Sequence, residues 1–114
     1  MAVEVRTSDF SSELELVSLS GRLDMETAEA DSPQLLQAVQ RSAAGVIVDL
    51  KSVDFISSSG LRMLLAAHKS VQETDKKLAV IHAQPAVYKI FKVSALDGLF
   101  HFCQSEKEAV EALS

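Results

Sequence analysis

The chain has 114 residues, of which 47% are hydrophobic and 24% are charged, and this composition argues against a disordered or collagen-like protein. The formal net charge of −5 disfavours a nucleic-acid-binding domain, because such a domain needs a basic surface to neutralise phosphates. The length is that of one domain, so we expect a single domain over residues 1–114.

Two strands are predicted near the start of the chain. Residues 3–6 alternate between apolar and charged side chains, which is the pattern of a short half-buried strand. In the second strand the apolar residues change face between Leu16 and Val17, and this shift indicates either a bulge or burial on both faces. Gly21 is expected to end the second strand.

A proline interrupts the helical pattern that follows. Inside a helix, Pro33 would lose a backbone hydrogen bond and clash with the preceding turn. The sequence therefore predicts a short helical turn over residues 25–30 and a separate helix after it. In the second helix Ser32 is expected to be the N-cap and Pro33 the first residue, with the end near residues 43–45.

The remaining elements alternate between strands and helices. The first of them is a β-branched run, which is typical of a central strand covered on both faces, and the last begins at a capping box of Ser105 and Glu108. These elements are expected over residues 45–50, 61–71, 78–81, 85–93, 99–103 and 106–113. The order predicts an α/β fold with a mixed, mostly parallel sheet and about four helices packed on it.

Features of targeting, redox chemistry and metal binding are scarce. The single cysteine, Cys103, excludes an internal disulfide, and its apolar surroundings predict a buried thiol in a reducing cytosol. No second cysteine or histidine cluster lies near it, so we expect no metal site and no cofactor. Residues 1–10 lack the apolar core of a signal peptide, and no run of about 18 apolar residues predicts a transmembrane span.

Three consecutive serines, Ser57, Ser58 and Ser59, precede the clearest predicted helix. One of them is expected to be the N-cap of that helix, and this structural role alone would account for the serine run. A functional role is the alternative, because the serines follow a buried parallel strand at its carboxyl end, where open α/β sheets place their functional crevices.

Several segments, taken in order, resemble the STAS domain of bacterial anti-sigma factor antagonists. The matching segments are Gly21–Asp24, Val46–Leu50, Val53, Phe55–Ile56, Ser58–Leu61 and Pro85–Asp97. The resemblance extends over nearly the whole chain. It implies a single STAS-like domain that acts as a cytoplasmic partner-binding module and not as an enzyme.

The resemblance also implies a phosphorylation switch. The serine just before the glycine, here Ser59, would be phosphorylated by a partner that is both a serine kinase and an anti-sigma factor, and a serine phosphatase would act on the product. The unphosphorylated form would bind the anti-sigma factor and free the sigma factor. By the same resemblance, the partner surface would consist of Asp24, Ser57, Ser58, Gly60, Leu61 and Arg62.

One position departs from the family pattern. The family usually has an acidic residue two positions before the acceptor serine, whereas this chain has Ser57. The change leaves open which kinase recognises the site and whether Ser58 is used instead of Ser59.

A serine at a helix N-terminus suits a phosphate, because the helix end stabilises an anion and phosphorylation adds about −1.5 to −2 charges. Arg62 lies three residues after Ser59 on the same helix face. It is expected to pair with the phosphate, to contact an acidic partner, or to remain solvated.

Three other functions are alternatives. Ser58 or Ser59 as a catalytic nucleophile would need a base from His68, His82 or His101, but no nucleophile motif is present and His68 is expected to be a satisfied core or boundary histidine. A metal-nucleotide site could use the aspartates at positions 24, 49 and 54, but a phosphate-binding loop is missing. A third function keeps the fold and makes the chain a non-switching scaffold subunit of a stress-signalling or transporter complex.

Overall fold

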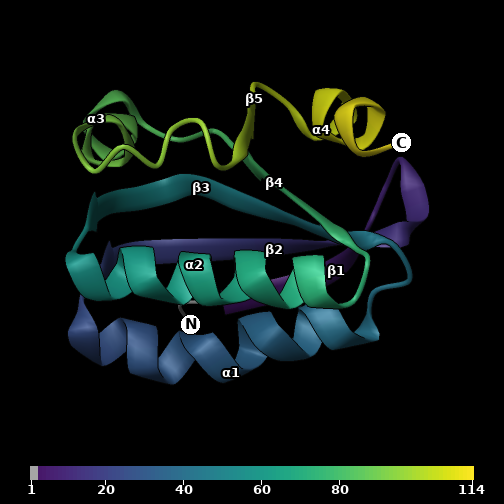
Figure 1. Ribbon diagram of the computed structural model, residues 1–114, viewed down its shortest axis with the longest axis horizontal. Helices are drawn as coiled ribbons and strands as arrows, with labels where there is room; N and C mark the ends of the chain where they lie inside the picture. The colour runs from purple at the N-terminus through teal and green to yellow at the C-terminus, as the bar shows by residue number, and fades with distance from the viewer. Residues whose placement is uncertain (1–2) are drawn as a thin grey trace.

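The computed structural model describes residues 3–114 and shows one mixed sheet (Figure 1). Met1 and Ala2, which the sequence analysis counted in the domain, lie outside the described residues. The strands are β1 (Val3–Ser8), β2 (Ser11–Leu23), β3 (Gly45–Ile56), β4 (Lys77–Ile81) and β5 (His101–Cys103), and they lie in the sheet in that order. β1 is antiparallel to β2, and the other neighbours are parallel, so the expected mixed and mostly parallel sheet is confirmed.

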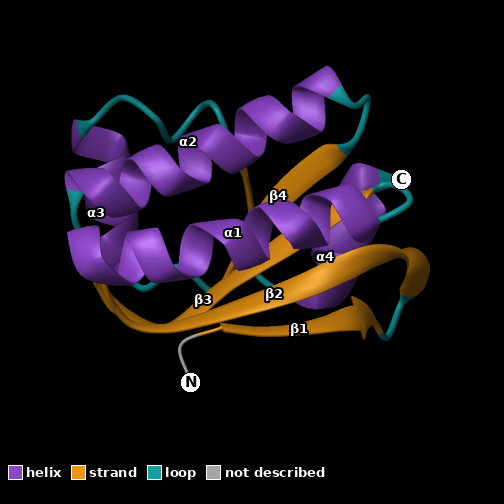
Figure 2. Ribbon diagram, turned by 90° about the horizontal axis from the view of Figure 1, so that it is seen from below, coloured by secondary structure: helices purple, strands orange, loops and turns teal. Residues whose placement is uncertain are grey.

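Helices cover both faces of this sheet. They are α1 (Met25–Arg41), α2 (Ser58–Glu73), α3 (Pro85–Val93) and α4 (Glu106–Leu113). α1 and α2 lie side by side on one face, and α4 lies on the opposite face (Figures 1 and 2). The larger hydrophobic core fills the α1–α2 side and includes Val87 and Phe91 of α3, whereas a smaller core lies under α4.

The change of face in β2 reflects burial on both sides of the sheet. Leu14 and Leu16 belong to the core under α4, and Val17 and Leu19 belong to the core under α1 and α2. The pairing of β2 with β3 shifts after Ser18, and no shift occurs between Leu16 and Val17. Of the two predicted explanations, burial on both faces is therefore confirmed.

The expected end of β2 at Gly21 is wrong, because the strand continues to Leu23. Gly21 has a φ of +85°, a conformation that glycine adopts without the steric cost of a side chain. The pairing of β2 with β3 shifts beside it and then resumes, so that Leu23 pairs with Ile56. The glycine thus bends the strand, and the added residues carry β2 to the same edge of the sheet as the end of β3.

The expected break at Pro33 is also wrong, because α1 is one helix with Pro33 inside it and Ser32 is not an N-cap. The carbonyl that loses its partner belongs to Glu29, four residues earlier, and Glu29 is exposed to solvent. Burial also continues along one stripe across the proline, at Ala28, Asp31, Leu35, Ala38 and Val39. Packing of this stripe therefore outweighs the local cost of proline.

The later elements agree with the sequence, with differences at their ends. β3 is the central strand and continues to Ile56, whereas residues after Leu50 were expected to lie in a connection. α3 begins at Pro85 as predicted, but Val93, expected on its apolar face, is 71% exposed. Among residues 3–114, none of the helices has the length and apolar character needed to span a bilayer.

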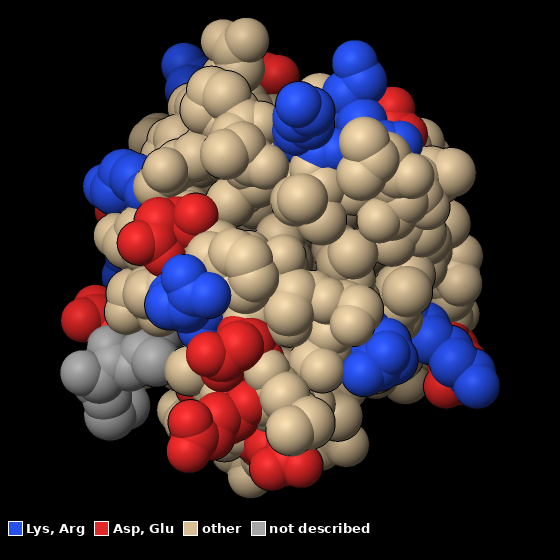
Figure 3. Space-filling model, turned by 90° about the vertical axis from the view of Figure 1, so that its left-hand side faces the viewer, with Lys and Arg blue, Asp and Glu red and all other residues tan. Residues whose placement is uncertain are grey.

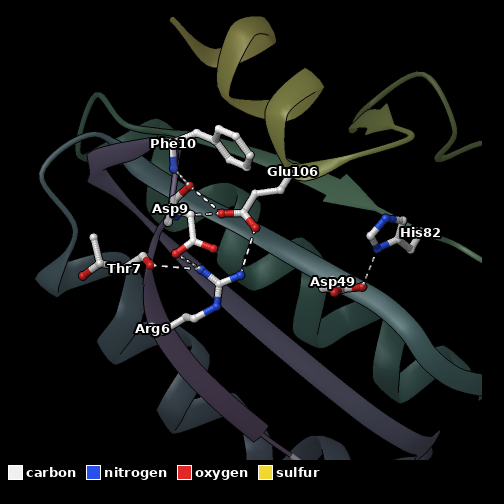
Figure 4. Close-up of polar contacts among 8 residues, drawn as sticks. Arg6, Thr7, Asp9, Phe10, Asp49, His82 and Glu106 are labelled. Atoms are coloured by element: carbon white, nitrogen blue, oxygen red, sulfur yellow. Dashed lines mark hydrogen bonds and ion pairs between the residues drawn. The ribbon is translucent and has the colours of Figure 1, made fainter.

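A polar network ties α4 to the turn between β1 and β2 (Figure 4). Glu106 at the start of α4 accepts hydrogen bonds from Arg6 Nη2 at 2.9 Å, from Ser8 Oγ at 2.7 Å and from the Asp9 N–H at 2.9 Å. Ser105 is the N-cap of α4, as the capping box predicted, and its hydroxyl accepts from the Glu108 N–H. These bonds fix the first turn of α4 against the other end of the chain.

Candidate functional site

The site is built where β2 and β3 end side by side. Leu23 and Ile56 are register partners, and each is followed immediately by the N-cap of a helix. Asp24 is therefore the cap of α1 and Ser57 the cap of α2, and the two helices begin at the same edge of the sheet (Figure 1). Because a helix N-terminus carries partial positive charge, this edge favours an anion.

Ser57 holds the start of α2 against the end of β2. Its hydroxyl donates to the Leu23 carbonyl at 3.0 Å and accepts from the Gly60 N–H at 3.3 Å, and its own N–H donates to the Leu23 carbonyl at 2.8 Å. These contacts identify Ser57 as the N-cap that the sequence left open among three serines. Serine and aspartate cap helices about equally well. The departure from the acidic family residue therefore preserves the cap and removes a negative charge from the helix start.

Gly60 and Leu61 lie beneath the surface that the sequence analysis assigned to partner binding. A Cβ added to Gly60 would lie 2.7 Å from the Leu23 carbonyl oxygen and 2.8 Å from Ile56 Cγ1. Leu61 is 8% exposed and belongs to the larger core. Both residues are therefore buried and position the first turn of α2.

Ser58 and Ser59 form the accessible part of this turn. Ser58 is exposed and Ser59 is half-buried. Arg62 Nη2 donates a hydrogen bond to Ser59 Oγ at 3.1 Å, so the expected proximity of these two side chains is present. The amides of the first turn have no carbonyl one turn earlier in the helix to accept from them. An added negative charge on Ser59 would thus lie beside a guanidinium and a helix N-terminus.

Asp24 supplies a fixed negative charge at the neighbouring helix start. Its Oδ1 accepts from the Thr27 N–H at 3.1 Å, and Thr27 Oγ1 accepts from the Asp24 N–H at 2.9 Å. These hydrogen bonds, first of all the one from the Thr27 backbone, hold the pKa of the Asp24 carboxyl below its ordinary value. Asp24 is thus ionised at neutral pH and stabilises α1 from its capping position.

An open groove with a volume of about 390 Å³ runs between α1 and α2 beside Ser59. Four of its residues are Met or Ala, and Glu29 and Arg62 are its two charged residues. The lining consists of Met25, Ala28, Glu29, Ser32, Ser59, Arg62, Met63 and Ala66. Figure 3 shows this end of the molecule, with a broad uncharged area in the middle and right of the view.

The residues of the alternative catalytic site do not meet. No histidine of the described chain lines the groove beside Ser59. His82 Nδ1 lies 3.1 Å from Asp49 Oδ1 on another part of the sheet (Figure 4). His68 packs edge-to-face on Phe100, but its Nε2 is buried without a hydrogen-bond partner among residues 3–114. His68 therefore lies at the core boundary as expected, and its interpretation as a satisfied histidine is wrong.

The three aspartates of the alternative metal-nucleotide site have separate roles in the structure. Asp24 caps α1 and Asp49 contacts His82, while Asp54 is exposed. In the part of the chain that the structure describes, no three His, Cys, Asp or Glu residues are grouped to hold a metal ion. Cys103 is half-buried, and burial followed by the charge of Glu108 raises the pKa of its thiol.

Sequence reasoning did not assign six residues of the groove to the site. Four lie on α1 and two on α2: Met25, Ala28, Glu29, Ser32, Met63 and Ala66. The helical turn predicted over residues 25–30 already placed Met25 and Glu29 on a helix. That this helix lies beside α2 depends on tertiary packing, of which the sequence contains no local signal.

The sequence is similar to those of known proteins. Residues 7–109 match the family model of the STAS domain. The anti-sigma F factor antagonist of Paenibacillus polymyxa is 29% identical over 99 residues, which are 86% of this chain and 85% of that protein.

Solved structures show the same fold. The crystal structure of an anti-sigma factor antagonist from Mycobacterium paratuberculosis is 27% identical, with a TM-score of 0.84 over 97% of this chain and 92% of that chain. The structure of the Bacillus cell fate determinant SpoIIAA in its phosphorylated form is 20% identical, with a TM-score of 0.72 over 99% of this chain and 100% of that chain. Since the family model matches well over half of the sequence, the chain belongs to the STAS domain family.

Proposed function

We propose that this protein is an anti-sigma factor antagonist whose activity is switched off by phosphorylation of Ser59. In the unmodified form it binds an anti-sigma factor that is also a serine kinase, and this binding frees the sigma factor in the cytoplasm. A serine phosphatase returns the phosphorylated form to the active state. The names of the relatives support the class of function, and one of the similar structures is described as phosphorylated.

The observation that carries the proposal is the contact between Arg62 Nη2 and Ser59 Oγ in the first turn of α2. A phosphate on Ser59 would meet the guanidinium at this place, and charge-assisted Arg–phosphate bonds are stronger than neutral ones. Ser58 is more exposed but has no such arginine contact among the described residues. Ser59 is therefore the better acceptor of the two.

The fold supports a switch that acts without rearrangement. Ser57 anchors the helix start to the Leu23 carbonyl, and Gly60 packs against the same carbonyl. A phosphate on Ser59 would change the surface charge while this junction holds the helix in place. Moving a complex from 99% to 1% formed requires about 5.5 kcal/mol, which is within reach of a desolvated dianion at an interface.

The direct test is phosphorylation in vitro. The purified protein is incubated with ATP and with each anti-sigma factor kinase of the source organism, and intact mass and site mapping follow. We expect one phosphate on Ser59, none in Ser59→Ala, and normal modification of Ser58→Ala. Modification of Ser58 in the wild-type protein would contradict the assignment.

Binding of two variants tests the switch itself. Ser59→Ala is expected to stay bound to the kinase in the presence of ATP, because no phosphate can form. Ser59→Asp is expected to bind poorly, because it introduces a negative charge at the interface. Circular dichroism should show wild-type folding for both. Equal affinity of the two variants would instead support the non-switching scaffold.

A further inference from the structure

We infer that the outer edge of β1 pairs with β1 of a second copy of this chain, so that two sheets join across a two-fold axis at Val5. β1 is the first strand in the sheet order, and among residues 3–114 it pairs with β2 alone. Figure 2 shows it as the outermost strand, at the bottom of the view. No residue of β1 lines the groove beside Ser59, so the inference goes beyond the proposed function and does not depend on it.

The edge of β1 offers backbone groups to another strand. Successive residues of a strand direct their N–H and C=O groups to alternate sides, so about half of those in β1 point away from β2. β1 has six residues and no proline, and its one irregularity lies at its end, between Thr7 and Ser8. The opposite edge of the sheet is β5, which has only three residues. β1 is therefore the edge better able to accept a further strand.

The two charged side chains of β1 are opposite in sign and equidistant from Val5. Glu4 and Arg6 are both exposed and lie on either side of it. Arg6 contacts Glu106 of α4, so Arg6 and Glu4 lie on the α4 face of the sheet. On the other face, Val3 belongs to the larger core and Val5 packs against it. The exposed face of β1 therefore presents one charge of each sign, in mirror positions about its middle residue.

One antiparallel register joins these opposite charges directly. With Val5 opposite Val5 of the second copy, each Glu4 lies opposite an Arg6, and the symmetry produces this pair twice. With Glu4 or Arg6 on the axis, two like charges would face each other. A parallel, in-register pairing would also place like charges side by side. Charge complementarity therefore selects a second copy of the chain as the occupant of this edge.

Arg6 can take part in this pairing and keep its contacts within the chain. Its Nη2 lies 2.9 Å from Glu106 Oε1 and its Nη1 lies 3.4 Å from Asp9 Oδ1, yet 47% of its side chain is exposed. Its Nη1 also donates to the Thr7 carbonyl at 3.2 Å. A guanidinium has five N–H donors, so these contacts leave donors for another carboxylate.

Glu4 is the charge of β1 that lacks a counterion. No ion pair joins it to another residue in the part of the chain that the structure describes. It borders a hollow with Asp49 and Lys51, whose charges are opposite, and neither side chain is hydrogen-bonded to it. An arginine from the second copy would therefore give Glu4 its first direct counterion.

The size of the paired surface sets the expected strength of the dimer. Stable interfaces commonly bury about 1,600 Å² in total, and two six-residue strand edges bury less than this. We therefore expect a reversible dimer with a dissociation constant in the micromolar range. Sedimentation equilibrium over a series of protein concentrations measures this constant.

Charge reversal at Glu4 tests the pairing. Glu4→Arg would place a guanidinium opposite Arg6 of the second copy, twice in each dimer. We expect it to weaken dimerisation about tenfold or more. Glu111→Arg makes the same change of charge at an exposed position of α4 and should alter the constant less than about twofold. Equal constants for the wild type and Glu4→Arg, or a wild type that stays monomeric up to about 1 mM, would overturn the inference.

Disulfide crosslinking tests the register, in a Cys103→Ser background that removes the native thiol. Two Val5 residues directly opposite each other have Cα atoms about 4.5 to 5.5 Å apart, which a disulfide spans. Two Thr7 residues would lie four positions apart along the strands, about 14 Å, which is too far. With oxidised glutathione as the oxidant, Val5→Cys should form a covalent dimer and Thr7→Cys should remain monomeric on a non-reducing gel. The register is wrong if Val5→Cys does not crosslink or if both variants crosslink equally.

Both tests use the purified protein alone, without a kinase. Circular dichroism should show wild-type folding for Glu4→Arg, and the crosslinking test decides the question independently if that variant fails to fold. A monomeric protein would overturn the pairing of β1 and leave the assignment of Ser59 as the phosphorylation site unaffected. Conversely, a dimer with the expected register would stand even if no kinase modified Ser59.

Discussion

At the start of α2, some residues fix the position of the helix and others line the groove at the surface. Ser57 caps the helix and Gly60 lets it approach the end of β2, while Ser59 and Arg62 face the groove. The sequence predicted that Ser59 and Arg62 share a helix face, because they are three residues apart, and left the role of Arg62 open among three alternatives. It did not predict which serine caps the helix, since that depends on the Leu23 carbonyl from a distant strand.

The close packing of Gly60 leads to a stability prediction. In Gly60→Ala the new Cβ would lie 2.7 Å from the backbone oxygen of Leu23, which has little freedom to move. Alanine favours the helix by roughly 1 kcal/mol, but the steric overlap outweighs this gain. We expect a net loss of about 2 kcal/mol in the free energy of unfolding, measured with urea. Gly98→Ala is the control, because nothing lies within 4 Å of its added Cβ; a similar loss in both variants would contradict the argument.

At the scale of elements, α1 shows why local rules were insufficient. Pro33 lies inside the helix because the buried stripe continues past it and Glu29, whose carbonyl loses its partner, is an exposed residue. A local rule weighs the lost hydrogen bond but not the tertiary burial of Leu35 and its neighbours. The groove was not predicted either, because the packing of α1 beside α2 is a tertiary contact that local patterns do not indicate.

The buried stripe of α1 contains a carboxyl group that opposes folding. Asp31 is 2% exposed, its Oδ2 has no hydrogen-bond partner among residues 3–114, and burial raises its pKa above the ordinary 3.8. A raised pKa means that ionisation costs more in the folded state than in the unfolded state. The carboxyl therefore destabilises the fold above the unfolded pKa, and stability recovers as pH falls through the folded value.

Asp31→Asn should accordingly stabilise the protein at pH 7 by about 1 kcal/mol, because it removes an unpaired buried charge. The advantage should shrink as the pH falls through the raised, folded pKa, because the wild-type carboxyl then becomes protonated. Urea unfolding at several pH values measures both effects. Glu29→Gln on the exposed side of α1 serves as the control and should show neither. A gain that is independent of pH would exclude the electrostatic explanation.

At the scale of the whole molecule, the sequence indicated the class of fold but not the distribution of helices over the sheet. The alternation of strands and helices predicted a mixed sheet, and the structure confirms it. Which helix covers which face was not predicted, because right-handed crossovers fix the face only once the order of the strands is known, and the sequence did not indicate that order. The change of face at Leu16 and Val17 and the β-branched run over residues 45–50 were the local signs that both faces are covered.

Glu106 connects the two ends of the chain, and its titration should be visible in global stability. Burial alone would raise its pKa, but hydrogen bonds from Ser8, Arg6 and the Asp9 N–H outweigh burial and leave the pKa below its ordinary 4.5. A lowered pKa contributes stability that is present above the unfolded value. This contribution is lost as pH falls through the lower, folded value.

We expect Glu106→Gln to lower the free energy of unfolding at pH 7 by about 2 kcal/mol, the scale of hydrogen bonds to a charged group. The difference from the wild type should narrow as the pH falls below 4.5 and through the lower, folded value, because the wild-type carboxylate then becomes protonated. Glu111→Gln, on an exposed turn of the same helix, is the control for the loss of one negative charge from α4. A difference that stays constant as the pH falls through the folded pKa would mean that the network acts by packing and not by charge.

The hydrogen bond from the Ser57 hydroxyl to the Leu23 carbonyl also has a consequence for the timing of the switch. If phosphorylation changes the surface charge while α2 stays in place, no slow conformational change has to precede the change in partner binding. The delay between a stimulus and its transcriptional response would then equal the turnover time of the kinase and the phosphatase that form and hydrolyse the phosphate ester of Ser59. A cell could retune that delay by changing enzyme abundance alone, with the antagonist itself unaltered.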